Sequence, residues 1–350
     1  MKQLLRYGFF LGTLFSGCTV YNAATTPSSY QPGLYSATTG QRLLSDSLPA
    51  SSVQWPDYRV LRFEHKACTD TFRLPELHEP FRSMKSPYPP GAVWVDNANA
   101  WLDEAEISNQ EWRQYELQQV KAGVPAAALA PSAAAQPVPD YYTNRFYTYY
   151  PVVGISYEQA QAFCKWRSQV VTALLNQRNH VALADSLNPA YVRCRYRLPT
   201  EREWEAAAAL QSKLPFGTAC PTLPVQLVPA AAAYLRQRSG STKPVAEIQA
   251  DIIAYNKTRP TLAVITCARE APYFLRSQTP GYVYQRPVNY YGLYQLLGNA
   301  AELVQEKGVT KGGSYRDALS DCRIAARGTY AGPAPHIGFR AAATVSRPTP

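Results

Sequence analysis

The chain has 350 residues, of which 46% are hydrophobic, and its formal net charge is +10. This length fits one large domain or two small ones, and the hydrophobic content is ample for a packed core. The Lys and Arg residues are scattered, with no long run of like charge and no basic stripe interleaved with aromatic residues. The charge pattern therefore argues against a nucleic-acid partner and indicates a mildly basic, solvated surface.

The N-terminus has the pattern of an export signal over residues 1–17. Lys2 and Arg6 flank a short apolar run that ends in Ser-Gly directly before Cys18. A membrane span needs about 20 apolar residues, so a cleaved signal fits this segment better than a membrane helix. The ending resembles a bacterial lipobox, which predicts a lipid anchor on Cys18; the alternative is an ordinary signal peptide with an incidental Cys. No acidic residue follows Cys18 directly, so we expect an outer-membrane lipoprotein of the cell envelope, on its periplasmic face or its surface.

Composition divides the rest of the chain into two parts. Residues 18–90 are rich in Ser, Thr, Pro and Tyr with weak periodicity. This predicts a flexible tether over 19–50, followed by a small N-terminal extension. From residue 91 the apolar pattern sharpens, and we expect one domain over 91–350, with strand segments at 92–95 and 101–102.

Three helix starts carry the same signature, a hydroxyl residue followed three positions later by Glu or Gln. The hydroxyl residues are Ser108, Ser156 and Thr200. This capping-box pattern predicts a helix that begins directly after each of them. Each helix contains one Trp, which we expect to pack in the core rather than to stack on a ligand.

Five phrases, in a fixed order, resemble the formylglycine-generating enzyme family, also called the sulfatase-modifying-factor family. They are YPVVGISYEQAQAFCKW (150–166), RLPTEREWE (197–205), NYYGLYQLLGNAAE (289–302), KGGSYRD (311–317) and IGFRAA (337–342). The resemblance implies an α+β fold of short strands and helices with much irregular loop, related in outline to C-type lectins. Relative to the family pattern, residues 169–194 are an insertion.

The sequence departs from the family pattern at the cysteine pair on which the family's oxidase chemistry depends. The family's oxidases bind Cu(I) between two thiolates, and the first of those positions here is Asp317, counted from Ser314. The second falls on Cys322, but the segment from Ser314 to Arg327 is shorter than in the oxidases, and Cys322 then fills an apolar position. Soft Cu(I) prefers two sulfur ligands, so a carboxylate and one thiolate make a poor site. We expect no bound copper and no formylglycine-generating activity.

A calcium site is the second expectation that the resemblance carries. Family members often bind structural Ca²⁺ through a phrase that corresponds here to Gln295, Gly298, Ala300 and Glu302. Carbonyl and carboxylate oxygens suit Ca²⁺. The alternative is that Glu302 caps the turn before it.

Other candidate ligands give weaker signals. Ergothioneine-type iron enzymes of this fold bind iron through a His triad. The four His residues here lack metal-ligand spacing, and the one alternative left is that His65 and His78 converge in space. The others are His180 and His336. An acidic cluster stands just before the first helix, where negative charge is favoured in any case. Its members are Asp103, Glu104 and Glu106.

If Cys18 carries lipid, six cysteines remain and none form a C-x-x-C pair, so neither a zinc site nor a thioredoxin-like pair is indicated. In an exported protein they permit disulfides, but the spacing selects no pairing. They are Cys68, Cys164, Cys194, Cys220, Cys267 and Cys322.

Fold and anchor together favour a non-catalytic binding or assembly module with envelope protein partners. This combination resembles Bacteroidetes lipoproteins of the gliding-motility and type 9 secretion systems. One alternative is an enzyme, either a formylglycine-type oxidase or a non-haem iron enzyme with a rearranged site. Another is a lectin-like module that binds glycan or peptide.

Overall fold

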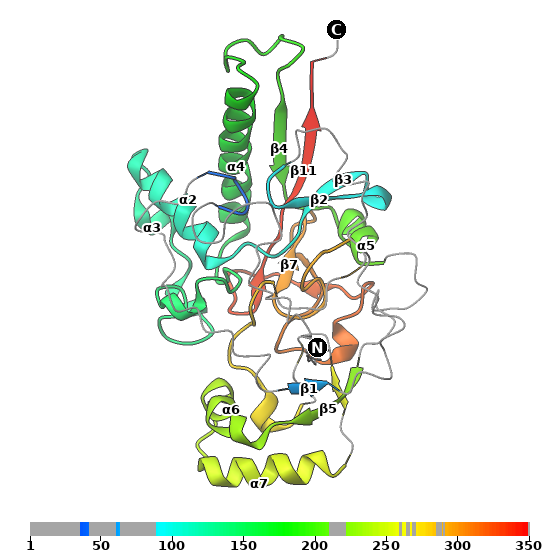
Figure 1. Cartoon of the computed structure of the whole chain (residues 1–350). Coiled ribbons are helices and arrows are strands. Elements are labelled where there is room, and N and C mark those ends of the chain that lie inside the picture. The colour runs from blue at the N-terminus through cyan, green and yellow to red at the C-terminus, as the bar shows by residue number, and fades with distance from the viewer. Residues whose placement is uncertain are drawn as a thin grey trace, which may run out of the picture.

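The computed structural model describes residues 36–41, 61–63, 89–209, 222–258, 261–263, 267, 271–284, 289 and 291–348. It is an α+β structure of short strands, short helices and long irregular connections (Figure 1). The fold class expected from the resemblance is thereby confirmed. Within the described ranges, no helix is long and apolar enough to cross a membrane. The predictions for Cys18, Cys68, Cys220, His65 and His78 lie outside these residues.

The central sheet joins the beginning of the domain to its end. Its four antiparallel strands are, in spatial order, β2 (Ala92–Val95), β3 (Ala100–Asp103), β11 (Ala342–Ser346) and β4 (Arg193–Arg197). The predicted strand segments at 92–95 and 101–102 are confirmed. Asn99 makes the tight turn between β2 and β3 in the left-handed region, at φ 49°. Trp94 and Trp101 then meet edge to face across the pair, with ring centroids 5.5 Å apart.

The long helix α4 (Tyr157–Arg178) covers the free edge of β4 (Figure 1). Three polar side chains of α4 bind the backbone in and next to β4: Ser168, Thr172 and Asn176. Each accepts a hydrogen bond from the N–H of one backbone residue and donates a hydrogen bond to the carbonyl of that residue. The backbone partners are Tyr196, Cys194 and Val192. Four residues of helix and two of strand both advance about 6 Å, so the two series stay in step. The helix thus satisfies an edge that would otherwise be open to pairing, and the predicted insertion at 169–194 supplies much of this arrangement.

The three predicted helix starts are confirmed in α2 (Asn109–Lys121), α4 and α5 (Glu201–Ala209). Ser108 accepts a hydrogen bond from the N–H of Glu111, and Ser156 forms a complete capping box with Gln159. Thr200 and Glu203 exchange both bonds of the same motif. A one-turn helix, α3 (Ala126–Leu129), follows α2.

Aromatic side chains fill the core between α2 and α4. Trp112 stacks on Phe163 at 5.5 Å and meets Phe339 edge to face at 6.1 Å. Trp166 packs in the same cluster, whereas Trp204 of α5 lies in a second buried cluster beneath the central sheet. The prediction that these Trp residues pack in the core is confirmed.

A second sheet assembles the phrases of the last fifth of the chain. Its strands, in spatial order, are β10 (Ile337–Gly338), β7 (Ala301–Leu303), β8 (Val309–Lys311) and β9 (Gly328–Thr329). β10 and β7 run parallel, with Gly338 opposite Glu302. This register brings Arg340, two residues beyond Gly338, close to Glu302.

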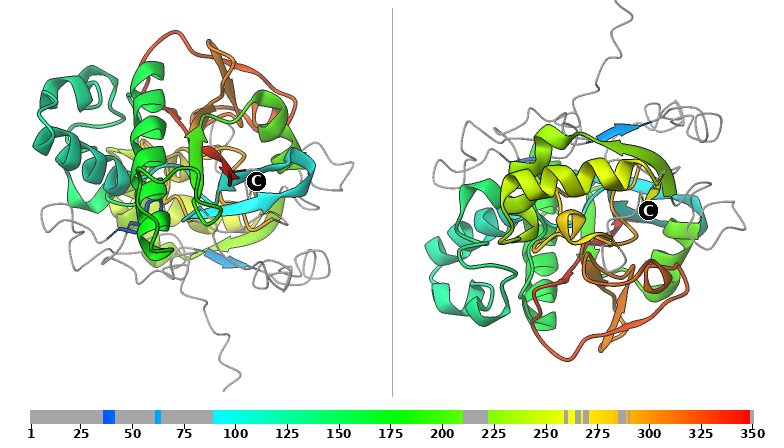
Figure 2. Two further views of the ribbon diagram at one scale, coloured as in Figure 1. Left: turned by 90° about the horizontal axis from the view of Figure 1, so that it is seen from above. Right: turned by 90° about the horizontal axis from the view of Figure 1, so that it is seen from below.

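A third sheet forms the lower end of the molecule in Figure 1, and Figure 2 shows α7 lying across that end. Its strands are β1 (Leu61–Phe63), β5 (Thr222–Leu227) and β6 (Thr261–Ala263), accompanied by α6 (Ala232–Ser239) and α7 (Val245–Asn256). The helices bury a core of their own around Leu235, Ile248 and Phe274. β1 belongs to the predicted N-terminal extension.

Residues 36–41 correct the prediction of a flexible tether over 19–50. Ser36, Ala37 and Thr38 lie buried against α2, where both hydroxyls and the Ala37 N–H donate to the Glu111 carboxylate. The Arg167 Nε donates to the carbonyl of Thr38 at 2.7 Å. A buried carboxylate and a buried guanidinium need polar partners, and this short segment supplies them. The tether prediction is therefore wrong for these six residues.

Candidate functional site

At the position that the spacing after Ser314 predicts for the family's first copper ligand stands a carboxylate that is already engaged in hydrogen bonds. Gly312 and Gly313 take positive φ values of 87° and 65° and turn the chain into Ser314. The Asp317 Oδ2 accepts hydrogen bonds from both the backbone N–H and the hydroxyl of Ser314, each at 2.7 Å. Asp317 therefore closes the turn that presents it, and it brings no sulfur to the site.

Cys322 is completely buried, as predicted for a structural cysteine. Its Sγ lies 3.9 Å from the Ser314 carbonyl. A hydrogen bond with Cys267, together with burial, raises the pKa of the Cys322 thiol. The thiolate form that a metal requires is consequently disfavoured at Cys322.

Three of the residues predicted to bind calcium, Gln295, Gly298 and Ala300, lie just before β7, whereas Glu302 lies in β7 and its carboxylate already has other partners. The N–H of Gly298 donates to Gly312, and that of Ala300 donates to the Glu106 carboxylate. Both Glu302 carboxylate oxygens accept hydrogen bonds from Arg340, and one also accepts from the Trp204 indole at 2.7 Å. A divalent cation on Glu302 would lie against this buried positive charge, so the donor set does not fit Ca²⁺ as arranged here. The calcium site stays a prediction that these contacts disfavour.

Arg340 and Glu302 form the electrostatic centre of this region. The Arg340 Nη2 lies 2.6 Å from Glu302 Oε1, and both side chains are 0% exposed. The remaining guanidinium N–H groups donate to the carbonyls of Asp103, Glu104 and Tyr294. Burial raises the pKa of Glu302, and the neighbouring guanidinium opposes that rise. One ion pair thus connects β7 to β3 and to the segment before β7.

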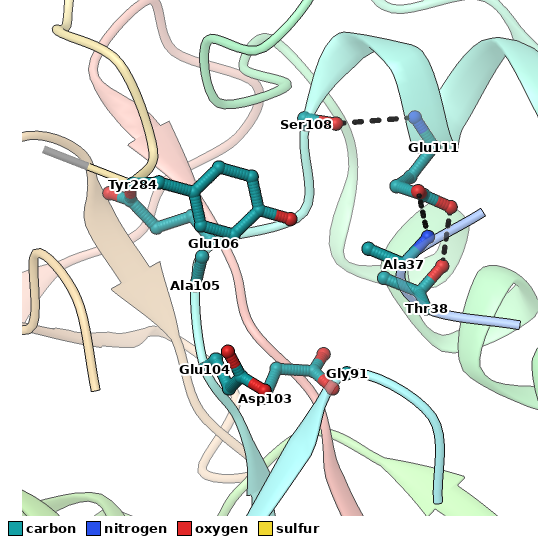
Figure 3. A pocket seen from close by; sticks show the side chains of 10 residues that line it. All are labelled: Ala37, Thr38, Gly91, Asp103, Glu104, Ala105, Glu106, Ser108, Glu111 and Tyr284. Carbon is teal, nitrogen blue, oxygen red and sulfur yellow. Dashed lines mark hydrogen bonds between the residues drawn. The ribbon is translucent and has the colours of Figure 1, made fainter. Parts of the chain in front are cut away.

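The predicted acidic cluster lines a small cavity, shown in Figure 3. Asp103 is bound by both terminal nitrogens of Arg167, at 2.7 Å each. Glu106 accepts hydrogen bonds from the Asn299 side chain and the Ala300 N–H. The helix N-terminus alone therefore does not explain Asp103 and Glu106, because these two carboxylates have buried partners of their own. The cavity measures only about 10 Å³, about enough for one water molecule and too little for a substrate.

Glu104 is the exception in this cluster. Its carboxylate lies beside Asp103 at one end of the cavity (Figure 3) and makes no hydrogen bond or ion pair within the described residues. Burial and the neighbouring Asp103 raise the pKa of Glu104 to about 8. The side chain is consequently mostly protonated at neutral pH, which avoids a second buried negative charge next to Asp103.

The His residues that the structure describes do not assemble a metal site. His180 is exposed at the end of α4, at φ 55°. His336 is half-buried near Arg316 and Asp317, and burial lowers its pKa. Among the described residues, no group of three or more His, Cys, Asp or Glu side chains is arranged to hold a metal ion.

A larger cleft lies between α4 and β4. It has a volume of about 320 Å³, within the range of ligand-binding clefts. Lys165 and Arg195 line it with exposed side chains, and neither forms an ion pair within the described part of the chain. The third cation, Arg197, is bound by Glu203 at 2.5 Å. Two positive charges that lack an ion-pair partner among the described residues therefore face this cleft.

Sequence reasoning missed the buried cations that organise these sites. Arg340 stands in the IGFR phrase, and Lys311 precedes the Gly-Gly-Ser turn and is held by Glu205 at 2.7 Å. Arg167 follows Trp166 in α4, on a helix face that is otherwise apolar. A cation at a core position of an amphipathic helix is the signal that points to a buried partner.

Comparison with known proteins places these observations in a family context. A model of the sulfatase-modifying factor enzyme 1-like domain matches residues 69–345. The structure of PvdO from Pseudomonas aeruginosa is 14% identical, with a TM-score of 0.40, over 70% of this chain and 80% of that chain. Variable protein 1 of Treponema denticola is 18% identical, with a TM-score of 0.36, over 74% and 92%. CarF is 17% identical, with a TM-score of 0.37, over 72% and 87%. No curated protein matches the chain significantly.

Proposed function

Because this chain belongs to the sulfatase-modifying factor enzyme 1-like family, we propose that it uses the family's fold as a non-catalytic binding or assembly module. One observation carries the proposal. At the first copper position stands Asp317, whose carboxylate is held by Ser314 at 2.7 Å. Cu(I) chemistry of the family type needs two thiolates at this place.

The proposed location is the bacterial envelope, with a lipid anchor on Cys18. The support is the sequence of the N-terminus, where a short apolar segment behind Lys2 and Arg6 ends directly before that Cys. A lipid anchor and a domain without oxidase ligands suit a protein that holds partners at a membrane. Lipoproteins of the gliding-motility and type 9 secretion systems offer a parallel in architecture. Labelling with a fatty-acid probe tests the anchor, and unchanged labelling of Cys18→Ser would contradict it.

The cleft between α4 and β4 is the surface that we propose for the partner. Two of its cations, Lys165 and Arg195, have no ion-pair partner among the residues that the structure describes. They favour an acidic partner, because complementary charge steers association and penalises partners of like charge. The hydrogen-bonding side chains Gln161, Gln169 and Gln305 line the same cleft. An acidic peptide segment fits this combination of charge and amide groups.

Charge reversal in the cleft tests the binding role. The probe is a fluorescent poly-glutamate peptide, and its affinity for the full chain is measured by anisotropy at low salt. The double variant Lys165→Glu/Arg195→Glu should lose at least about tenfold in affinity, or about 1.4 kcal/mol. Lys257→Glu, an exposed change at the end of α7, is the control for net charge. Equal affinities of a single Lys257→Glu and a single Lys165→Glu variant would show that only overall charge matters.

A further inference from the structure

Cys267 and Cys322 lie next to each other although a long stretch of chain separates them. Cys267 packs against the same buried cluster that contains Cys322, and the two thiols share a hydrogen bond. The other two described cysteines, Cys164 and Cys194, belong to the separate cluster around α4. The spacing of the cysteines selects no pairing, whereas the structure brings Cys267 and Cys322 into contact.

We propose that Cys267 and Cys322 form a disulfide that fastens the segment around Cys267 to the turn at Gly312–Ser314. Cys322 is fixed against this turn by its contact with the Ser314 carbonyl at 3.9 Å. Gly313 allows the approach, because a Cβ at that position would lie 2.8 Å from the Cys322 Sγ. The cross-link therefore joins two residues that are already in contact.

An external disulfide is the oxidant for this step. Cys267 is partly exposed and Cys322 is buried, so the Cys267 thiolate attacks the external disulfide and releases one thiol. Cys322 then loses its proton and attacks the Cys267 sulfur, which forms the Cys267–Cys322 bond and releases the second thiol. The two electrons and two protons of the cysteine pair end on the two released thiols.

The disulfide has a consequence for the site beside it. An oxidised pair has no thiolate to offer, so neither sulfur is available to a soft metal at the Ser314 turn. The inference goes beyond the proposed binding role and does not depend on any partner. Its test is carried out on the purified chain, so its failure is distinguishable from a failure of partner binding.

Peptide mapping tests the pair directly. The full chain is incubated with oxidised glutathione, blocked with N-ethylmaleimide under denaturing conditions and digested without reductant. The expected product is one cross-linked peptide that contains Cys267 and Cys322, with Cys164 and Cys194 alkylated. A bond from Cys267 to any other cysteine overturns the proposal, and so does glutathione retained on Cys267 beside an alkylated Cys322.

A melting experiment supplies a second readout. Reductant should lower the melting temperature of the oxidised wild type by about 5 °C, because the disulfide constrains the unfolded chain. Cys267→Ser should melt at the same temperature with and without reductant. Cys164→Ala, a buried cysteine of the other cluster, is the matched control and should keep the full response. An equal response in Cys267→Ser and Cys164→Ala contradicts the proposed pair.

Discussion

Glu302 of β7 and Arg340, just before β11, form an ion pair in which neither side chain is exposed to solvent. The pair exists because β10 and β7 align in parallel with Gly338 opposite Glu302. Arg340 also reaches three backbone carbonyls, while the Trp204 indole completes the partners of Glu302. The position expected to bind a divalent cation is thus compensated by a guanidinium from the same chain.

Removal of one partner of this pair should be strongly destabilising. Arg340→Met leaves Glu302 buried without its cation, and we expect a loss of about 3–5 kcal/mol in the free energy of unfolding. The exposed pair of Lys307 and Glu158 is the control, and Lys307→Met should leave the free energy of unfolding nearly unchanged, because solvent screens an exposed pair. Urea unfolding of the two variants measures both values, and equal losses would contradict the central role of Arg340.

Calcium should have no effect on stability. An ion that binds only the folded state raises its stability by mass action, by about 2.7 kcal/mol at 100 times the dissociation constant. Since Arg340 already neutralises Glu302, we expect the wild-type melting curve to be the same with Ca²⁺ and with chelator. A chelator-sensitive curve that becomes insensitive in Glu302→Gln would instead establish the calcium site.

Glu104 should make stability fall as the pH rises. Its folded-state pKa is about 8, raised by burial and by Asp103 from an ordinary value of 4.5. The contribution of Glu104 to the free energy of unfolding is therefore complete below pH 4.5 and is lost as the pH rises towards 8. Glu104→Gln cannot ionise, so its advantage over wild type should grow to about 4 kcal/mol near pH 8. Unfolding experiments at several pH values measure this difference, and a constant difference would refute the assignment.

The side-chain series on α4 should be sensitive to single deletions. Asn176→Ala leaves the Val192 N–H and carbonyl without partners at a buried edge, with an expected cost of about 2 kcal/mol. The Asn179 side chain, at the exposed end of α4, donates a hydrogen bond to the Ala190 carbonyl, and Asn179 is therefore the matched control. Asn179→Ala should cost less than about 1 kcal/mol in the same unfolding assay. Similar losses in both variants would show that the edge contacts do not matter.

The sequence predicted those parts of the fold that local rules govern. The capping residues Ser108, Ser156 and Thr200 located three helix starts, because each motif acts within one turn of chain. The pairing of Arg340 with Glu302 could not be predicted, since it depends on the register between β10 and β7. The pairing of Arg167 with Asp103 could not be predicted either, since it depends on how helix α4 lies against β3. The contact of residues 36–41 with Glu111 likewise joins distant segments and could not be predicted from local patterns.

In the candidate site, too, local spacing predicts some features, whereas contacts between distant segments decide the others. The position of Asp317 was available from the spacing after Ser314, but the hydrogen bonds that occupy its carboxylate were not. The proximity of Cys267 to Cys322 and the open charges of Lys165 and Arg195 appear only when the chain is folded. Spacing identifies the residue type at a position, and the fold decides which partners that residue meets.

The most direct test of the non-catalytic account is an aldehyde assay on copper-loaded protein. The full chain is incubated in air, under reducing conditions, with a peptide that carries the sulfatase cysteine motif, and the peptide is analysed by mass spectrometry. The account predicts no formylglycine and no stoichiometric copper, because Asp317 replaces a thiolate ligand. Formylglycine that is produced by the wild type and disappears in Cys322→Ala would contradict it.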